Sequence, residues 1–207
     1  MNNFIVITLG TGLGSGIVVN GELVYGADGL AAEIGHTIYN HSGRECSCGR
    51  KGCLETYVSA GGIRKTVFDL LRDSNTESEL HNINQKDITS NMIYDAALRG
   101  DKIAIEAFDY TGKVLGTVLA DSVAYTSPEA IILFGGLALA DHLLIEPTKR
   151  YMKENILGNF KNKVKILKSA LPEINSAVLG AGALIWNEME KAQKESRTRL
   201  QLTDSGI

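Results

Sequence analysis

Three cysteines lie in one short stretch of this chain, with His36 upstream of them and a glutamate at either end, Glu33 and Glu55. Cys46, Cys48 and Cys53 are the only cysteines of the protein, and His36 lies ten positions before the first of them. Three thiolates and one imidazole make up the ligand set of a tetrahedral Cys3His zinc site. Because four protein ligands leave no open position for water, we expect this zinc to be structural and to shape the loop.

The alternative interpretation of the cysteines is a set of buried thiols without a metal. Their neighbours are polar, which favours a metal loop: Arg44, Glu45, Ser47, Arg50 and Lys51. The odd number of cysteines and their close spacing also favour a metal over disulfides. His41 is a second candidate ligand, but its setting is typical of a solvated loop residue. A nucleic-acid-binding zinc ribbon would show two C-x-x-C knuckles and a basic surface, and the sequence has neither.

Glu33 and Glu55 lie at the two ends of this stretch. A carboxylate accepts hydrogen bonds only, which suits it to the hydroxyl groups of a polyol. The alternative is that both are ordinary surface residues in salt bridges. We expect them to be functional only if the metal loop fixes their positions.

The composition is that of a soluble globular protein. The 207 residues carry a net charge of −3 and are 44% hydrophobic, which suits one large domain. We find no stripe of Lys and Arg, so we do not expect direct contact with nucleic acid. No run approaches the ~20 apolar residues of a membrane span. The N-terminus also lacks the features of a signal peptide, so we expect a cytoplasmic protein.

A glycine-rich segment, Gly10–Gly16, follows a predicted strand at Phe4–Leu9 and precedes a second strand at 17–19. Glycines allow backbone N–H groups to approach an anionic oxygen, and Thr11 and Ser15 could add hydroxyl donors. A strand follows instead of a helix, which excludes a P-loop and a Rossmann fingerprint. A glycine-rich hairpin without a ligand is the alternative. Asn20-Gly21 then predicts a type I′ turn into a returning strand at 22–25.

A second glycine pair, Gly135-Gly136, ends the apolar strand predicted at Ala130–Phe134. Ligands of open α/β sheets lie outside the carboxyl ends of strands, so a nucleoside could lie here against the backbone. The alternative is a strand-to-helix turn that needs glycine only for packing.

The remaining elements are predicted as helices and one further strand. Gly112 and Gly116 are spaced to let a second backbone approach the longest helix closely. The predicted ranges are a helix at 54–71 broken at Ala60–Gly62, helices at 92–99, 101–126, 141–154 and 176–193, and a strand at 164–167. From Lys191 onward the chain is polar without apolar periodicity, and we expect residues 191–207 to be a disordered tail.

Taken together, these segments resemble the ROK family, which holds bacterial glucokinases, related sugar kinases and sugar-responsive repressors. The matching segments are Leu9-Gly10-Thr11-Gly12-Leu13-Gly14, Glu33-Ile34-Gly35-His36, the run from Cys46 to Glu55, and Phe134-Gly135-Gly136. The pattern E-x-G-H followed by C-x-C-G-x-x-G-C-x-E is highly specific, and the resemblance covers nearly the whole chain.

The resemblance implies an α/β fold of the actin/hexokinase-like (ribonuclease H-like) ATPase type, a mixed sheet flanked by helices with a zinc-stabilised loop. Residues 1–190 would be mainly the C-terminal lobe of a two-lobed protein. The residues that match functional positions of the family fall into three groups. They are the zinc ligands His36, Cys46, Cys48 and Cys53, the sugar-contacting Glu33, His36 and Glu55, and the nucleotide-contacting Gly10, Thr11, Gly12, Gly135 and Gly136.

Two parts of the family pattern have no counterpart in this sequence. One is the first phosphate loop, an Asp-x-Gly-Gly turn, and the other is an Asn-Asp pair whose aspartate is the catalytic base. We expect both in a missing N-terminal lobe, upstream of Phe4. The complete enzyme would use Mg-ATP to phosphorylate a glucose-like hexose, and this chain alone would be inactive.

Two other functions stay open at this point. The chain could be the sugar-sensing effector domain of a ROK-type repressor, although a sensor has less need of the Gly10–Gly16 loop. The chain could also be a stand-alone zinc-stabilised interaction module. This function is disfavoured because the apolar strands are built to join a larger sheet. The family resemblance also implies a homo-oligomer.

Overall fold

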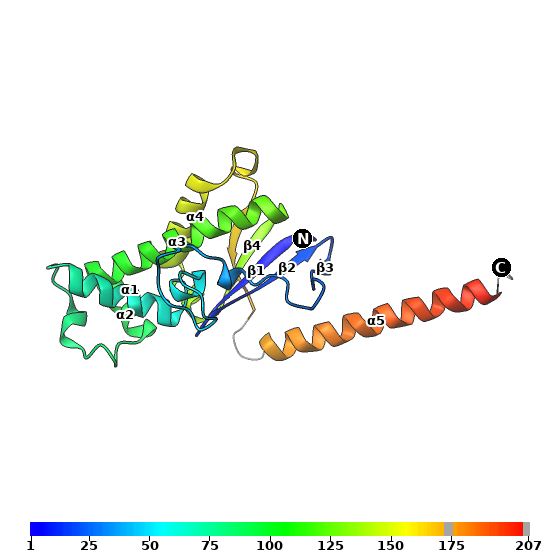
Figure 1. The fold of residues 1–207 in the computed structure, drawn as a ribbon, viewed down its shortest axis with the longest axis horizontal. Helices are drawn as coiled ribbons and strands as arrows, with labels where there is room; N and C mark the ends of the chain where they lie inside the picture. The colour runs from blue at the N-terminus through cyan, green and yellow to red at the C-terminus, as the bar shows by residue number, and fades with distance from the viewer. Residues whose placement is uncertain (172–175, 205–207) are drawn as a thin grey trace. The chain divides into compact units, whose positions relative to one another are not determined.

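The structure is a computed structural model that describes residues 1–171 and 176–204. It divides into two compact units, Met1–Ser169 and Ala170–Ile207. The first unit is a five-stranded sheet with helices, and the second contains one helix (Figure 1). None of the helices within the described ranges is long and apolar enough to cross a membrane.

The sheet has the strand order β3-β2-β1-β4-β5. The strands are β1 (Phe4–Leu9), β2 (Leu13–Val19), β3 (Glu22–Leu23), β4 (Ala130–Phe134) and β5 (Lys165–Lys168). β1 pairs in parallel with β4, and β4 with β5, whereas β2 is antiparallel to both of its neighbours. The predicted mixed sheet is therefore confirmed, and the carboxyl ends of β1 and β4 meet at one edge.

The loop between the first two strands is shorter than the Gly10–Gly16 segment that we predicted. β2 begins at Leu13, so Gly14, Ser15 and Gly16 are strand residues paired with β1. The reason is that ladder hydrogen bonds use only the backbone, and buried Leu13 pairs with Leu9 to start the hairpin. The type I′ turn is confirmed, since Asn20 and Gly21 both have positive φ, but β3 ends at Leu23 instead of Tyr25.

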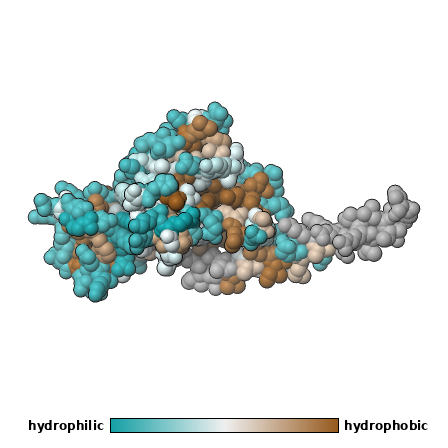
Figure 2. Space-filling view, viewed as in Figure 1, coloured by the Kyte–Doolittle hydropathy of each residue, from teal (hydrophilic) through white to brown (hydrophobic). Residues whose placement is uncertain are grey.

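Four α-helices belong to the first unit. They are α1 (Ala60–Asp73), α2 (Ser90–Leu98), α3 (Lys102–Thr126) and α4 (His142–Asn155). Asp101 caps α3 by accepting a hydrogen bond from the N–H of Ala104, at 3.0 Å. Figure 2 shows hydrophilic side chains over the end of this unit where α1 and α2 lie.

The helix break that we predicted at Ala60–Gly62 lies a few residues earlier. Leu54–Thr56 forms a short 3-10 helix, η2, and Ser59 then caps α1 by accepting from the N–H of Gly62, at 3.0 Å. The glycines are therefore in the first helical turn, because the serine cap determines the start of the helix more strongly than the glycines disrupt it.

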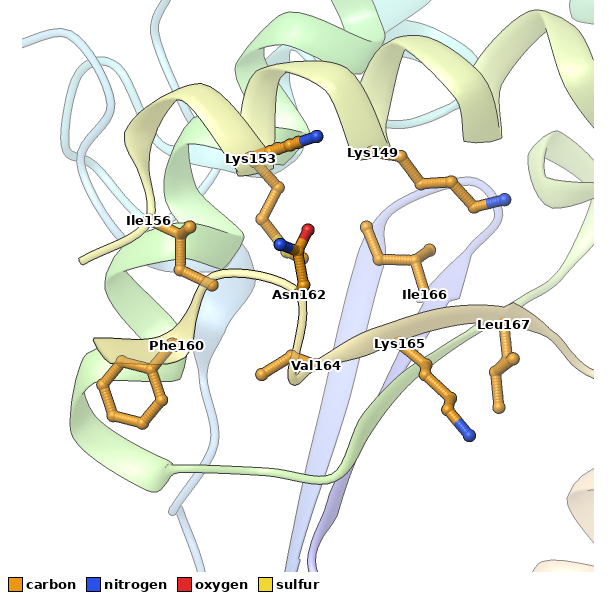
Figure 3. A pocket seen from close by; sticks show the side chains of 10 residues that line it. Lys149, Lys153, Ile156, Phe160, Asn162, Val164, Lys165, Ile166 and Leu167 are labelled. Carbon is orange, nitrogen blue, oxygen red and sulfur yellow. The ribbon is translucent and has the colours of Figure 1, made fainter. Parts of the chain in front are cut away.

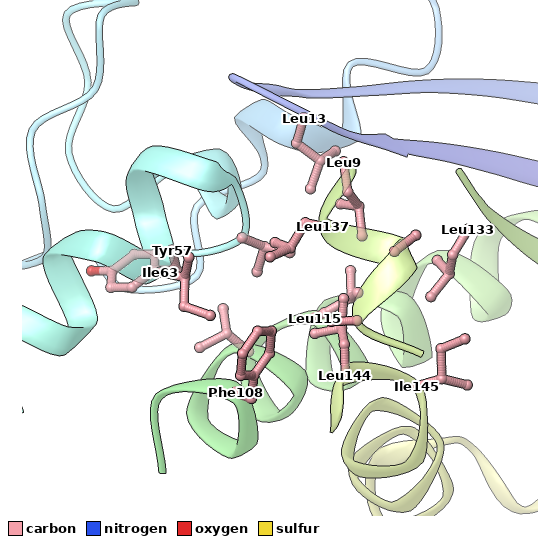
Figure 4. Close-up of a cluster of buried hydrophobic side chains, with 14 of the residues drawn as sticks. Leu9, Leu13, Tyr57, Ile63, Phe108, Leu115, Leu133, Leu137, Leu144 and Ile145 are labelled. Carbon is pink, nitrogen blue, oxygen red and sulfur yellow. The ribbon is translucent and has the colours of Figure 1, made fainter. Parts of the chain in front are cut away.

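The core lies between one face of the sheet and helices α3 and α4. Ile5, Ile7 and Leu9 of β1 are fully buried in the same cluster as Leu115 and Leu144 (Figure 4). At this contact α3 and α4 approach closely, as the spacing of Gly112 and Gly116 predicted. A Cβ at Gly112 would lie 2.8 Å from the Pro147 ring, and one at Gly116 would lie 2.5 Å from the carbonyl oxygen of Thr148.

The second unit contains helix α5, Ser176–Asp204. The helix predicted to start at Ser176 is present, but it does not end near Gln193. The backbone is helical to Asp204 where we expected a disordered tail from Lys191. The physical reason is composition, because this segment is rich in Lys, Glu, Gln and Arg, which favour helix without any apolar periodicity.

We expect Gly116→Ala to lower the free energy of unfolding by about 1–3 kcal/mol, since the added methyl group overpacks the α3–α4 contact. Gly61→Ala is the matched control, because a Cβ there meets only Ser59 Oγ at an ordinary 3.9 Å. That control should be neutral or stabilising by up to about 1 kcal/mol through helix propensity. Urea denaturation measures both, and equal effects of the two changes would contradict the predicted close packing.

Candidate functional site

The four predicted metal ligands are close together. The ligand atoms of His36, Cys46, Cys48 and Cys53 all lie within 4.8 Å of one another. Cys48 Sγ is 3.6 Å from Cys53 Sγ, and Cys46 Sγ is 3.7 Å from His36 Nδ1. Zn–S bonds of about 2.3 Å in a tetrahedron place two sulfurs about 3.8 Å apart. The donor types and their spacing therefore fit a structural zinc ion.

Local backbone hydrogen bonds build this loop. The N–H of Gly49 donates to the carbonyl of Cys46 at 3.0 Å, and the N–H of Cys46 donates to that of Arg50 at 2.9 Å. A β-bridge between Ile38 and Cys53 joins the two ends of the loop. These contacts turn Cys46 and Cys48 toward Cys53 within a few residues, so the sequence pattern itself specifies the knuckle.

The thiols of Cys48 and Cys53 have opposite electrostatic surroundings. Hydrogen bonds from the Arg50 side chain and backbone lower the pKa of Cys48 to about 6. Burial raises the pKa of Cys53 to about 12, in agreement with its complete lack of exposed surface. Metal binding requires thiolates. Cys48 is therefore ionised near neutral pH, whereas the proton of Cys53 must be displaced by a bound cation.

The histidine lies between the two glutamates. Glu33 precedes the 3-10 helix η1, Ile34–His36, and Glu55 lies in η2. His36 Nε2 is 3.9 Å from Glu33 Oε2, and His36 Nδ1 is 3.8 Å from Glu55 Oε1. The Glu33 side chain is 63% exposed, whereas that of Glu55 is 20% exposed and accepts a hydrogen bond from Cys46 Sγ at 3.2 Å. The structure thus brings together the three residues expected to contact a sugar.

The Gly10–Gly12 turn touches this group of side chains. A Cβ at Gly12 would lie 3.0 Å from Oε2 of Glu55, so the carboxylate rests directly on the turn. The N–H of Ala60 donates to the carbonyl of Gly10 at 2.9 Å, which fixes the turn to the start of α1. Gly10 and Thr11 are exposed. The N–H of Gly10 donates to the carbonyl of Gly12 at 3.0 Å within the turn, so Thr11 is the residue that the turn presents to a ligand.

The second glycine pair lies beside the first turn. Gly135 has a φ of +100°, and a Cβ there would lie 2.6 Å from the carbonyl oxygen of Leu9, the residue before Gly10. Only glycine allows β4 to end this close to β1. Gly136 is exposed and begins a 3-10 helix, Gly136–Ala140. Both predicted nucleotide-contacting segments therefore share one edge of the sheet.

Arg44 is a site residue whose role sequence reasoning missed. Its side chain is only 16% exposed, and its guanidinium carbon lies 4.6 Å from the centroid of the Tyr57 ring. Its other contacts are with helix α1 and the segment before it. They are hydrogen bonds to the carbonyls of Thr56 and Gly62, each 3.0 Å, to Thr66 Oγ1 at 3.1 Å, and to Asp69 Oδ2 at 2.9 Å.

Arg44 thus fastens the metal loop to α1, and a second anchor joins the other end of the stretch to the sheet. Ser15 Oγ in β2 accepts a hydrogen bond from the N–H of Ile34 at 3.1 Å and donates to the carbonyl of Ala32. In the sequence Arg44 is one of several polar residues beside the cysteines. Its partners lie 12 to 25 positions away, so no local pattern distinguishes it.

Comparison with known proteins adds three findings. The model of the ROK family matches residues 1–188. The chain is 32% identical over 203 residues to a glucokinase from Halalkalibacterium halodurans, a match that covers 95% of this chain and 60% of the relative. It is 30% identical over 185 residues to an N-acetylglucosamine repressor from Escherichia coli, which covers 89% of this chain and 44% of the repressor.

Among solved structures, the chain is similar to a ROK family glucokinase from Streptomyces griseus in complex with glucose and AMPPNP. The TM-score is 0.74 at 30% sequence identity, covering 81% of this chain and 55% of that one. The chain therefore has the actin/hexokinase-like fold. It spans less than two thirds of the length of the relatives it matches.

We expect purified protein to hold about one zinc ion per chain by elemental analysis. Cys48→Ser should lower that content well below one and make the Glu33–Glu55 segment sensitive to protease, because a ligand is lost. Cys48 is exposed, so its replacement costs little packing. Ser47→Ala is the adjacent control and should change neither quantity. Full zinc content together with unchanged proteolysis in Cys48→Ser would exclude this site.

Replacing Arg44 with methionine should lower the free energy of unfolding by about 2–3 kcal/mol, because two backbone carbonyls and Asp69 lose a charged donor. Lys51→Met removes the same charge from the same loop, where the lysine is 60% exposed and faces the exposed Glu45. That control should cost less than about 1 kcal/mol. Thermal or urea unfolding compares the two, and a loss in Arg44→Met no larger than in the control would contradict the anchoring role.

Proposed function

The chain belongs to the ROK family, and we propose that it is the C-terminal lobe of a sugar kinase of the glucokinase type. The complete enzyme would transfer the γ-phosphoryl group of Mg-ATP to a hydroxyl group of a glucose-like hexose. The glucokinase relatives support this proposal.

The observation that carries the proposal is the contact between the Gly10–Gly12 turn and Glu55. Phosphoryl transfer depends on positioning, because the acceptor hydroxyl must lie in line with the phosphorus at about 3–3.5 Å. An exposed glycine turn that carries a threonine hydroxyl is suited to phosphate oxygens, and a carboxylate is suited to a sugar hydroxyl. Their direct contact is the arrangement that a sugar kinase requires.

We assign Glu33, His36 and Glu55 to the sugar side. The carboxylates would accept hydrogen bonds from hydroxyl groups, and His36 Nε2 faces the exposed Glu33, on the side where substrate could enter. Zinc, when bound by His36 and the three cysteines, would act as a crosslink that holds this loop. The partly buried Glu55 is then fixed in orientation by the loop beneath it.

Gly10, Thr11 and Gly12 would contact phosphate groups, and Gly135 and Gly136 would contact the adenosine side of the nucleotide. We further propose that the catalytic base and the first phosphate loop come from sequence outside these 207 residues. From composition we still expect a cytoplasmic protein whose present chain contacts neither nucleic acid nor membrane. From the family resemblance we expect a homo-oligomer.

The second candidate is the sugar-sensing effector domain of a ROK-type repressor. The similarity to the N-acetylglucosamine repressor supports it. A sensor would bind sugar without needing nucleotide. Binding of AMPPNP with magnesium, measured by calorimetry and abolished by Gly12→Val, would therefore favour the kinase.

We expect the 207-residue chain alone to show negligible phosphorylation of glucose in a coupled assay, because the base is elsewhere. Kinases typically turn over about 1–100 times per second. A rate in that range for this chain alone would falsify the assignment of the catalytic base to sequence outside it.

For hexose binding, Glu55→Gln should weaken the affinity at least about tenfold, because a hydrogen bond to a charged acceptor contributes roughly 1.5–3 kcal/mol. Glu45→Gln makes the same chemical change in the same loop at a side chain that is 85% exposed, and it should leave binding unchanged. Calorimetric titration with a panel of hexoses measures both. Equal affinities of the two variants, or no hexose binding by the unaltered chain, would contradict the sugar-side role.

A further inference from the structure

A cavity of about 340 Å³ lies between the second half of α4 and strand β5 (Figure 3). None of its lining residues belongs to the two glycine turns or to the Glu33–Glu55 stretch. Its apolar lining consists of Met152, Ile156, Phe160, Val164, Ile166 and Leu167. Sites for small molecules typically measure about 300–1,000 Å³ and are mostly apolar with a few polar groups. The cavity thus has the size and lining of a small-ligand site.

Positive charge is concentrated around this cavity. Residues 149–168 contain six lysines and one arginine against a single acidic residue, Glu154, although the whole chain has a net charge of −3. Our sequence analysis, which found no stripe of Lys and Arg, missed this basic segment. Three of these lysines, Lys149, Lys153 and Lys165, line the cavity itself. Lysine stems pack against apolar surface while the ammonium groups stay at the rim. The cavity therefore combines an apolar interior with a cationic entrance.

Neighbouring carboxylates neutralise only part of this charge: Arg150 pairs with Asp109, and Lys168 with Asp141. Lys149 forms an exposed pair with Glu146 at 2.9 Å, and Lys165 helps to lower the pKa of the Glu129 carboxyl. Lys153 has no ion-pair partner within 4.0 Å among residues 1–171 and 176–204. Lys149 and Lys153 are four residues apart on α4, so they lie on the same face of the helix. Figure 3 shows the Asn162 amide between Lys153 and Val164, where it could add a neutral donor.

A simpler role exists for one of these residues. β5 is an edge strand, and lysines on edge strands hinder pairing with other chains. That role accounts for Lys165. It does not account for Lys149 and Lys153, which belong to a helix, nor for the cavity between the two elements.

We propose that this cavity binds a small, free amphiphilic anion, with its apolar part against Ile156, Val164 and Ile166 and its anionic group against Lys149 and Lys153. A carboxylate on a short acyl chain or on an aromatic ring has this chemistry. A sugar would leave the apolar lining without a partner. This site is independent of the function proposed above.

Octanoate is a suitable probe, with octan-1-ol as its uncharged counterpart. In methyl-labelled protein, octanoate should shift the NMR signals of Ile156, Val164 and Ile166 in a saturable way, and more weakly as salt rises. Octan-1-ol should bind at least about tenfold more weakly. The absence of shifts at these three residues, or equal binding of the alcohol, would overturn the proposal.

Two double variants test the role of the rim. Lys149→Gln with Lys153→Gln should weaken octanoate binding about tenfold, since two exposed charge pairs are lost. Lys161→Gln with Lys163→Gln removes the same charge from the same basic segment at residues that do not line the cavity, and it should change binding less than about twofold. Equal losses of octanoate affinity in the two variants would mean that the basic segment attracts anions without a specific site, which would overturn the proposal. Binding to phosphatidylglycerol vesicles without binding of free octanoate would assign the patch to a membrane surface and would also overturn it.

Discussion

The parallel pairing of β1 with β4 is the constraint on which the candidate site depends. Ile5 and Ile7 of β1 pair with Ile131 and Leu133 of β4, and all four side chains are fully buried. Burying each such side chain contributes about 1.5–3 kcal/mol, so apolar burial strongly stabilises the pairing of β1 with β4. Because the strands are parallel, their carboxyl ends lie at one edge. Both glycine turns are therefore delivered to the same place by the core itself.

The metal loop is attached to this edge by polar contacts. Arg44 joins it to α1, and the Ser15 hydroxyl joins its beginning to β2. Between these anchors Glu55 contacts Cys46, a predicted metal ligand, on one side and the Gly10–Gly12 turn on the other. A carboxylate in this position has little freedom, because the loop, the turn and the helix start each limit its movement. We infer that a zinc ion, when bound by these ligands, would serve the site by holding this carboxylate.

Charge is distributed unevenly over the first unit. The candidate sugar side carries two glutamates around one histidine, whereas the segment from Lys149 to Lys168 is strongly basic. The two regions use different elements, since the metal loop precedes α1 and the basic cavity lies between α4 and β5. A polar ligand and an amphiphilic anion could therefore be bound by one lobe without sharing a contact.

The sequence by itself determined the features that depend on near neighbours. The cysteine knuckle closes through hydrogen bonds within four residues, the Asn20-Gly21 turn through its own φ angles, and the start of α3 through Asp101. Only the tertiary structure decided the parallel pairing of β1 with β4, because paired residues such as Phe4 and Ala130 are far apart in the sequence. It also decided the role of Arg44, whose partner Asp69 is 25 positions away, and the cavity beside β5, whose walls come from separate elements. Local hydrogen bonds and turn preferences act within a few residues and can be read from them, whereas contacts between distant segments exist only after the core has packed.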